Sequence, residues 1–123
     1  MKPSWEALCG EAEGEIARIL AALPEPLRSR AREVPVALER RPSVALQQDG
    51  VEEDTLGLFT GAEWVEAGEV VMPPQIFLYL DNVWEVAETG GKRFGDELAT
   101  TFLHELGHFF GFDEDGLGAM GLE

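Results

Sequence analysis

The chain has 123 residues, 45% of them hydrophobic, and this size and composition predict one globular domain spanning residues 1–123. Its 24 acidic and 9 basic residues give a net charge of -15, which would repel a phosphate backbone, so we expect no nucleic-acid partner. We expect no membrane partner either, because no apolar run is long enough to cross a bilayer. The first residues turn acidic at once, unlike a signal peptide, and a single cysteine excludes an internal disulfide. These features together predict a cytoplasmic protein.

Helical periodicity begins close to the amino terminus. An apolar stripe predicts an amphipathic helix over residues 4–22, and Ser4 is a favourable N-cap for it. Pro24 and Pro26 end this helix, since proline removes a backbone donor and clashes with the preceding turn. A second, short helix is expected to follow them and to run to about Arg32.

The middle of the chain has the pattern of strands. Residues 33–39 predict a strand, and Pro35 places it at a sheet edge or marks its start. Residues 43–48 either extend that strand or form another. A short strand is expected over residues 56–61, and residues 75–80 are apolar on both faces, as in a central strand. Glycine and acidic residues indicate a turn or loop at residues 49–55 and at 89–91, and glycine and proline indicate a hairpin or loop over residues 62–74.

Two further helices are predicted after the last strand. Asn82 and Glu85 match a capping box, which predicts a short helix from there to about Glu88. The last helix is expected over residues 96–110, where Gly111 ends it. Helices at both ends of a group of short strands indicate an α+β fold in which helices pack on a small sheet.

The last predicted helix carries the chain's only two histidines, His104 and His108. Because they lie four residues apart, they project from the same helix face and can reach one metal ion. Glu105 is displaced from them by about 100°, so it can contact a water at the metal without being a ligand. This is the geometry of the H-E-x-x-H motif of zinc metallopeptidases. The core is expected on the other face, which is formed by Ala99, Phe102, Leu103, Leu106 and Phe110.

A catalytic zinc site needs a third protein ligand and one open position. Gly111 allows the chain to reverse after the helix, and three acidic residues follow it at Asp113, Glu114 and Asp115. Glu114 lies ten residues after His104 and is our first choice, with Asp115 next and Asp113 last.

The segment from His104 to Gly111, with the acidic residues after it, resembles the small bacterial zincin-like metallopeptidases. Their motif is H-E-x-x-H-x-x-G-x-x-D/E, and their chains have about this length. Residues 56–61 and 75–79 are also similar to that family's upstream strands, so the resemblance covers most of residues 33–115.

This resemblance implies a minimal zincin-like fold, with a small twisted mixed sheet, a backing helix and an active-site helix; the predicted N-terminal helix completes it. It implies that zinc is bound by His104, His108 and Glu114, with Glu105 as general base. Members of the family more often have Asp at the position of Glu114 and Glu at that of Asp115, so Asp115 stays open as the third ligand.

The favoured function is therefore a zinc peptidase acting on peptides or small proteins, with Glu105 accepting a proton from water. Tyr79, the only tyrosine, is expected in the core and not as an oxyanion donor. One alternative is a non-catalytic metal-binding or protein-interaction module, in which Trp5, Trp64 and Trp84 would form an exposed patch, although core packing is expected for at least two of them. A metal-dependent nuclease ranks lower: the related zincin-like rRNA-maturation endoribonucleases use H-G-x-x-H-x-x-G-x-D-H, which this acidic chain does not match.

Overall fold

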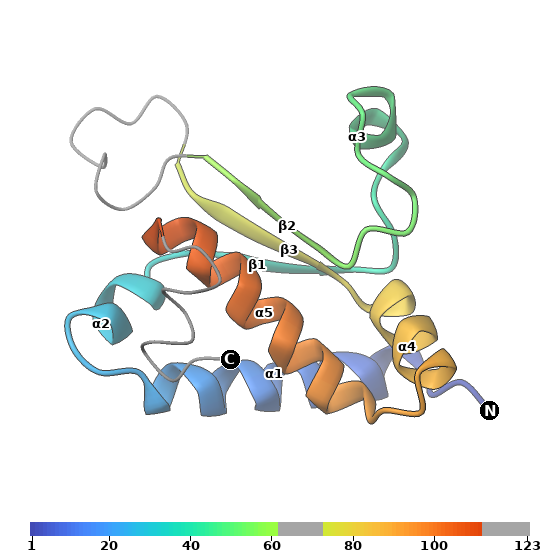
Figure 1. The fold of residues 1–123 in the computed structure, drawn as a ribbon, viewed down its shortest axis with the longest axis horizontal. Helices are drawn as coiled ribbons and strands as arrows, with labels where there is room; N and C mark the ends of the chain where they lie inside the picture. Colours follow the sequence, from blue (N-terminus) through green and yellow to red (C-terminus); the bar gives the residue numbers. More distant parts are fainter. Residues whose placement is uncertain (62–72, 112–123) are drawn as a thin grey trace.

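A three-stranded mixed sheet lies at the centre of the protein, in a computed structural model that describes residues 1–61 and 73–111 (Figure 1). The strand order is β1-β3-β2; β1 runs parallel to β3, and β2 runs antiparallel to it. The strands are β1 (Val36–Glu39), β2 (Gly57–Thr60) and β3 (Gln75–Tyr79). The helices are α1 (Trp5–Ala22), α2 (Leu27–Ala31), α3 (Val44–Gln48), α4 (Leu80–Thr89) and α5 (Phe94–Phe110).

The central strand is β3, as its apolar sequence predicts. Ile76 and Leu78 are both 0% exposed and point to the same face, because side chains alternate along a strand. Strand β1 begins directly after Pro35, whose carbonyl accepts a hydrogen bond from the Ile76 N–H. Pro35 therefore marks the strand start, one of its two predicted roles, and β1, an edge strand, begins three residues later than the predicted residue 33.

Helix α5 lies between the sheet and α1 and packs on both (Figure 1). Its buried apolar side chains join those of α1 and β3 in one hydrophobic cluster. Phe102, Leu106 and Phe110 are buried as predicted, and Ala99 and Leu103 are partly buried. Three additional α5 residues belong to this cluster: Phe94, Leu98 and Phe109. The architecture is α+β, with the small mixed sheet and packed helices of the expected minimal fold. Within the described ranges, no helix is long and apolar enough to cross a membrane.

The prediction of strand structure for residues 43–48 is wrong. Residues Val44–Gln48 form the short helix α3, and the Ser43 hydroxyl accepts a hydrogen bond of 3.2 Å from the Leu46 N–H. Serine at an N-cap satisfies one of the free amides of the first helical turn. This local hydrogen bond favours a helical turn over continuation of β1.

The predicted capping box at Asn82 is also wrong, because α4 begins at Leu80, directly after β3. Asn82 lies inside the helix at 2% exposure. Its side-chain NH2 donates to the backbone carbonyls of Glu53 and Thr55 at 2.8 and 2.9 Å, and its carbonyl accepts from Arg41 at 2.7 Å. Asn82 therefore ties α4 to the loop before β2, and this long-range role takes the place of a local cap.

The remaining helix boundaries are close to prediction. Ser4 caps α1 by accepting a 3.1 Å hydrogen bond from the Ala7 N–H, and α2 occupies the expected position. Helix α5 begins at Phe94, two residues before the predicted start, with Asp96 and Glu97 in its first turn. Gly111 ends it in the left-handed conformation at φ 75°, a backbone geometry that favours glycine.

Candidate metal centre

The predicted metal-binding residues lie on the third and fourth turns of α5. One ligand atom each from His104, Glu105 and His108 lies within 4.8 Å of the other two. The two imidazole rings have centroids 4.8 Å apart and planes at 86°. Both histidines are exposed, whereas Glu105 is only 7% exposed. The predicted polar face of the helix is therefore confirmed, and the motif places one carboxylate in the protein interior next to two accessible imidazoles.

Glu105 is buried because it points towards β2. A Cβ atom added to Gly57 would lie 3.1 Å from Glu105 Cγ and 2.9 Å from Thr101 Cγ2, so the backbone of β2 passes directly over the side chains of α5. Glycine is the residue that permits such a close approach within a strand. The absence of a side chain at position 57 makes room for Glu105 beneath the sheet.

The protein environment raises the pKa of Glu105 above its usual value. Burial is the main cause, because removal from water disfavours the charged carboxylate. The positive charges of His108 and His104, and a hydrogen bond from the Phe59 backbone N–H, act in the opposite direction. Glu105 is thus held between the edge of β2 and the two histidines.

The donor set fits a zinc ion. Imidazole nitrogens are preferred zinc ligands, a pair four residues apart on a helix can share one ion, and a neighbouring carboxylate adds negative charge. Zinc sites of this kind need one more protein ligand. The residues predicted for that position, Asp113, Glu114 and Asp115, lie outside the described residues, so the choice among them stays a prediction.

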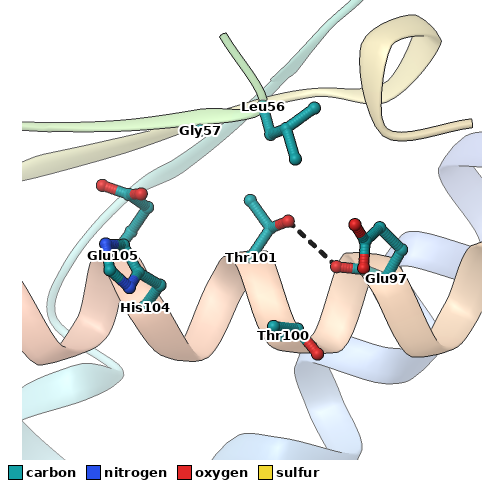
Figure 2. Close-up of a pocket in the computed structure, with 7 residues that line it drawn as sticks. All are labelled: Leu56, Gly57, Glu97, Thr100, Thr101, His104 and Glu105. Atoms are coloured by element: carbon teal, nitrogen blue, oxygen red, sulfur yellow. Dashed lines mark hydrogen bonds between the residues drawn. The ribbon is translucent and has the colours of Figure 1, made fainter. Parts of the chain in front are cut away.

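A cavity of about 310 Å³ opens beside His104 and Glu105. The first residue of β2, the residue before it and five residues on α5 line the cavity, as Figure 2 shows: Gly57, Leu56, Glu97, Thr100, Thr101, His104 and Glu105. The H-E-x-x-H motif does not include Glu97 or Thr101. Their spacing of seven and four residues from His104 and Glu105 nevertheless places them on the same stripe of the helix, so helical periodicity is the signal that finds them.

The remaining candidate residues lie elsewhere. Tyr79 is 0% exposed, and its ring stacks on Phe77 at 6.3 Å. Alternation along β3 puts both rings on the sheet face opposite Ile76, Leu78 and α5. Tyr79 is therefore buried, as expected, but away from the two histidines. Trp5 and Trp84 are partly buried against the core, as expected for at least two of the three tryptophans, and this does not support an exposed tryptophan patch. Trp64 lies outside the described residues.

Comparison with known proteins agrees with this geometry. A family described as zincin-like metallopeptidase matches residues 31–122, a range that contains the whole sheet and α5. No curated protein matches the chain.

Proposed function

The chain belongs to the zincin-like metallopeptidase family, and we propose that it is a zinc-dependent peptidase that hydrolyses peptides or small proteins. The observation that carries this proposal is the pair of exposed histidines with Glu105 buried beside them at the end of a cavity. Burial of a carboxylate costs free energy even where partners offset part of it, and here that cost falls on the carboxylate beside both imidazoles, which favours a functional role over a purely structural one.

In this proposal His104, His108 and Glu114 hold the ion. When bound, zinc supplies Lewis acidity, which acidifies water and polarises a carbonyl group. The Glu105 carboxylate accepts a proton from water and then delivers it to the leaving nitrogen. Its burial and the Phe59 N–H fix its position, so that the proton acceptor is already oriented before substrate arrives.

Strand β2 is the proposed docking edge for the substrate backbone. The Tyr79 N–H donates to the Leu56 carbonyl, so Leu56 and Leu58 direct their backbone groups towards β3. By alternation, the backbone groups of Gly57 and the Phe59 carbonyl point to the other edge, where the described residues supply no partner strand; the Phe59 N–H on that edge is already bonded to Glu105. An extended peptide can add to such an edge by main-chain hydrogen bonds, without a fixed sequence.

Metal binding tests the first part of this proposal. Purified protein loaded with zinc and dialysed should contain about one zinc per chain by elemental analysis. His104→Ala and His108→Ala should each lose it, since either change removes one of the imidazole ligands. Unchanged zinc content in both variants would exclude this site.

Cleavage of a mixed peptide library, with and without a chelator, tests the second part. Glu105→Gln should keep the zinc and the fold but lose hydrolysis, because an amide cannot accept the proton. Glu88→Gln, an exposed change of the same kind on α4, is the matched control and should cleave like the wild type. Zinc binding without cleavage of any peptide by the wild type would favour a non-catalytic metal-binding module instead.

A further inference from the structure

The side chains around the cavity beside Glu105 mostly offer hydrogen-bond acceptors. The Thr100 hydroxyl donates its proton to the Asp96 carbonyl at 3.1 Å. The Thr101 hydroxyl donates to the Glu97 carbonyl at 2.9 Å, the bond dashed in Figure 2. With their protons used in this way, both hydroxyl oxygens retain only acceptor capacity for a ligand. The Glu97 and Glu105 carboxylates are acceptors as well.

Glu97 is the wall residue with an uncommitted charge. Across residues 1–61 and 73–111, no basic side chain forms an ion pair with the Glu97 carboxylate. Lys2 and most of the arginines pair with other acidic residues. The side chain is only partly exposed and lines the cavity. A ligand group that carries several donors and a positive charge would match Glu97 and the two threonine oxygens together.

The relative direction of β2 and α5 tells which part of a substrate would reach Glu97. The first residue of β2, Gly57, lies over Thr101 and Glu105, and Phe59 contacts Phe109 with ring centroids 6.1 Å apart. Strand and helix therefore run in the same sense. A peptide that pairs antiparallel with β2 runs in the opposite sense, so its C-terminal part lies at the Glu97 end of the cavity.

The distance from the metal-binding residues to Glu97 fits a nearby substrate residue. Glu97 precedes His104 by seven residues, which is about 10.5 Å along the helix axis. An extended peptide advances about 3.3 Å per residue. The first or second residue after the cleaved bond therefore covers part of this distance along the peptide, and a long side chain on that residue can reach the rest of the way to Glu97.

From these observations we propose that Glu97 is a specificity-determining residue, which binds a lysine or arginine side chain located just after the cleaved bond. This inference rests on the proposed peptidase function, because it assigns one side of the substrate to this cavity. It adds a substrate class, peptides with a basic residue on the leaving-group side.

Ligand binding tests the cavity without any cleavage. Acetyl-arginine amide is titrated into zinc-loaded protein, with the neutral isostere acetyl-citrulline amide as the control ligand, and the methyl signals of Thr100 and Thr101 are followed by NMR. Arginine should bind about tenfold more tightly than citrulline, and Glu97→Gln should remove this difference. Asp96→Asn, the matched change at the neighbouring exposed acid outside the cavity, should preserve it. Equal affinities for the two ligands, or a preference that survives in Glu97→Gln, would overturn the assignment.

Cleavage then tests the position of the basic residue. In acetylated fluorogenic peptides, arginine at the first or second position after the cleaved bond should raise kcat/KM about tenfold over citrulline, and Glu97→Gln should abolish the gain. A preference for arginine only before the cleaved bond would refute the inferred orientation. If arginine binds but nothing is cleaved, the cavity assignment stands and the peptidase function fails. If peptides are cleaved but arginine is neither bound nor preferred, the peptidase function stands and the role of Glu97 is wrong.

Discussion

Gly57→Ala tests the close packing of β2 on α5, which buries Glu105. The added Cβ would lie 2.9 Å from Thr101 Cγ2, 3.1 Å from Glu105 Cγ and 3.3 Å from the Phe77 carbonyl oxygen. Carbon atoms pack best at about 3.5–4.0 Å, so the strand and helix must separate by roughly half an ångström. Such overpacking costs about 1–3 kcal/mol, and the loss of glycine's backbone entropy in the unfolded chain returns only about 0.5–1 kcal/mol. We therefore expect a net destabilisation of about 1 kcal/mol, near the middle of the difference between these two ranges.

Urea unfolding followed by circular dichroism measures this change. Gly10→Ala in α1 is the matched control, because an added Cβ there meets nothing within 4 Å. That variant should be stabilised by about 0.5–1 kcal/mol, since alanine is the better helix former. Thr101→Ser, which removes the nearest methyl group, should recover part of the loss when combined with Gly57→Ala. A Gly57→Ala protein as stable as the wild type would refute the reasoning, because strand and helix could then separate without cost.

Three further predictions concern other parts of the structure. Asn82→Ala removes three hydrogen bonds of 2.7–2.9 Å and leaves the part-buried carbonyls of Glu53 and Thr55 without this partner, so urea unfolding should show a loss of about 2–4 kcal/mol. A loss below about 1 kcal/mol would contradict that role. The fold raises the pKa of Glu105, so the folded state favours the protonated carboxyl. The contribution of Glu105 to the free energy of unfolding is therefore full below its ordinary pKa of 4.5 and is lost as the pH rises through the higher folded-state pKa. Metal-free Glu105→Gln should accordingly unfold at a higher temperature than the wild type at pH 7, and the difference in unfolding temperature should shrink towards pH 4. A lower unfolding temperature for Glu105→Gln at pH 7 would show that burial of the charged carboxylate does not destabilise the fold. Glu114→Ala should weaken zinc binding in calorimetry as much as the loss of one histidine, whereas Asp113→Ala and Asp115→Ala should have much smaller effects; a large loss only in Asp115→Ala would move the third ligand by one residue.

Several features of this protein follow from the sequence because they depend on neighbouring residues. The 3.6-residue period of α5 is enough to put His104 and His108 on one exposed face and Phe102 and Leu106 on the buried one. Gly111 ends that helix by its own backbone freedom. The uninterrupted apolar run of β3 likewise identifies the central strand, because both faces of a central strand are covered.

Errors appear where local signals compete with distant partners. Residues 43–48 have an apolar pattern too short to distinguish a strand from a helical turn, and the Ser43 cap decides for the helix. Asn82 has the local pattern of a helix cap, but its side-chain NH2 donates hydrogen bonds to backbone carbonyls 27 and 29 residues away. Neither outcome can be read from residue spacing alone.

The depth of Glu105 and the cavity beside it are decided by tertiary structure. Sequence spacing places Glu105 about 100° from the histidines, but whether that direction is solvent or protein depends on which strand crosses α5. The order β1-β3-β2 and the register of β2 bring Gly57 over Glu105, and the same crossing turns Glu97 and Thr101 into walls of the cavity. Strand order and register arise from contacts between residues far apart in the chain, so the motif determines the chemical groups and the sheet determines their surroundings.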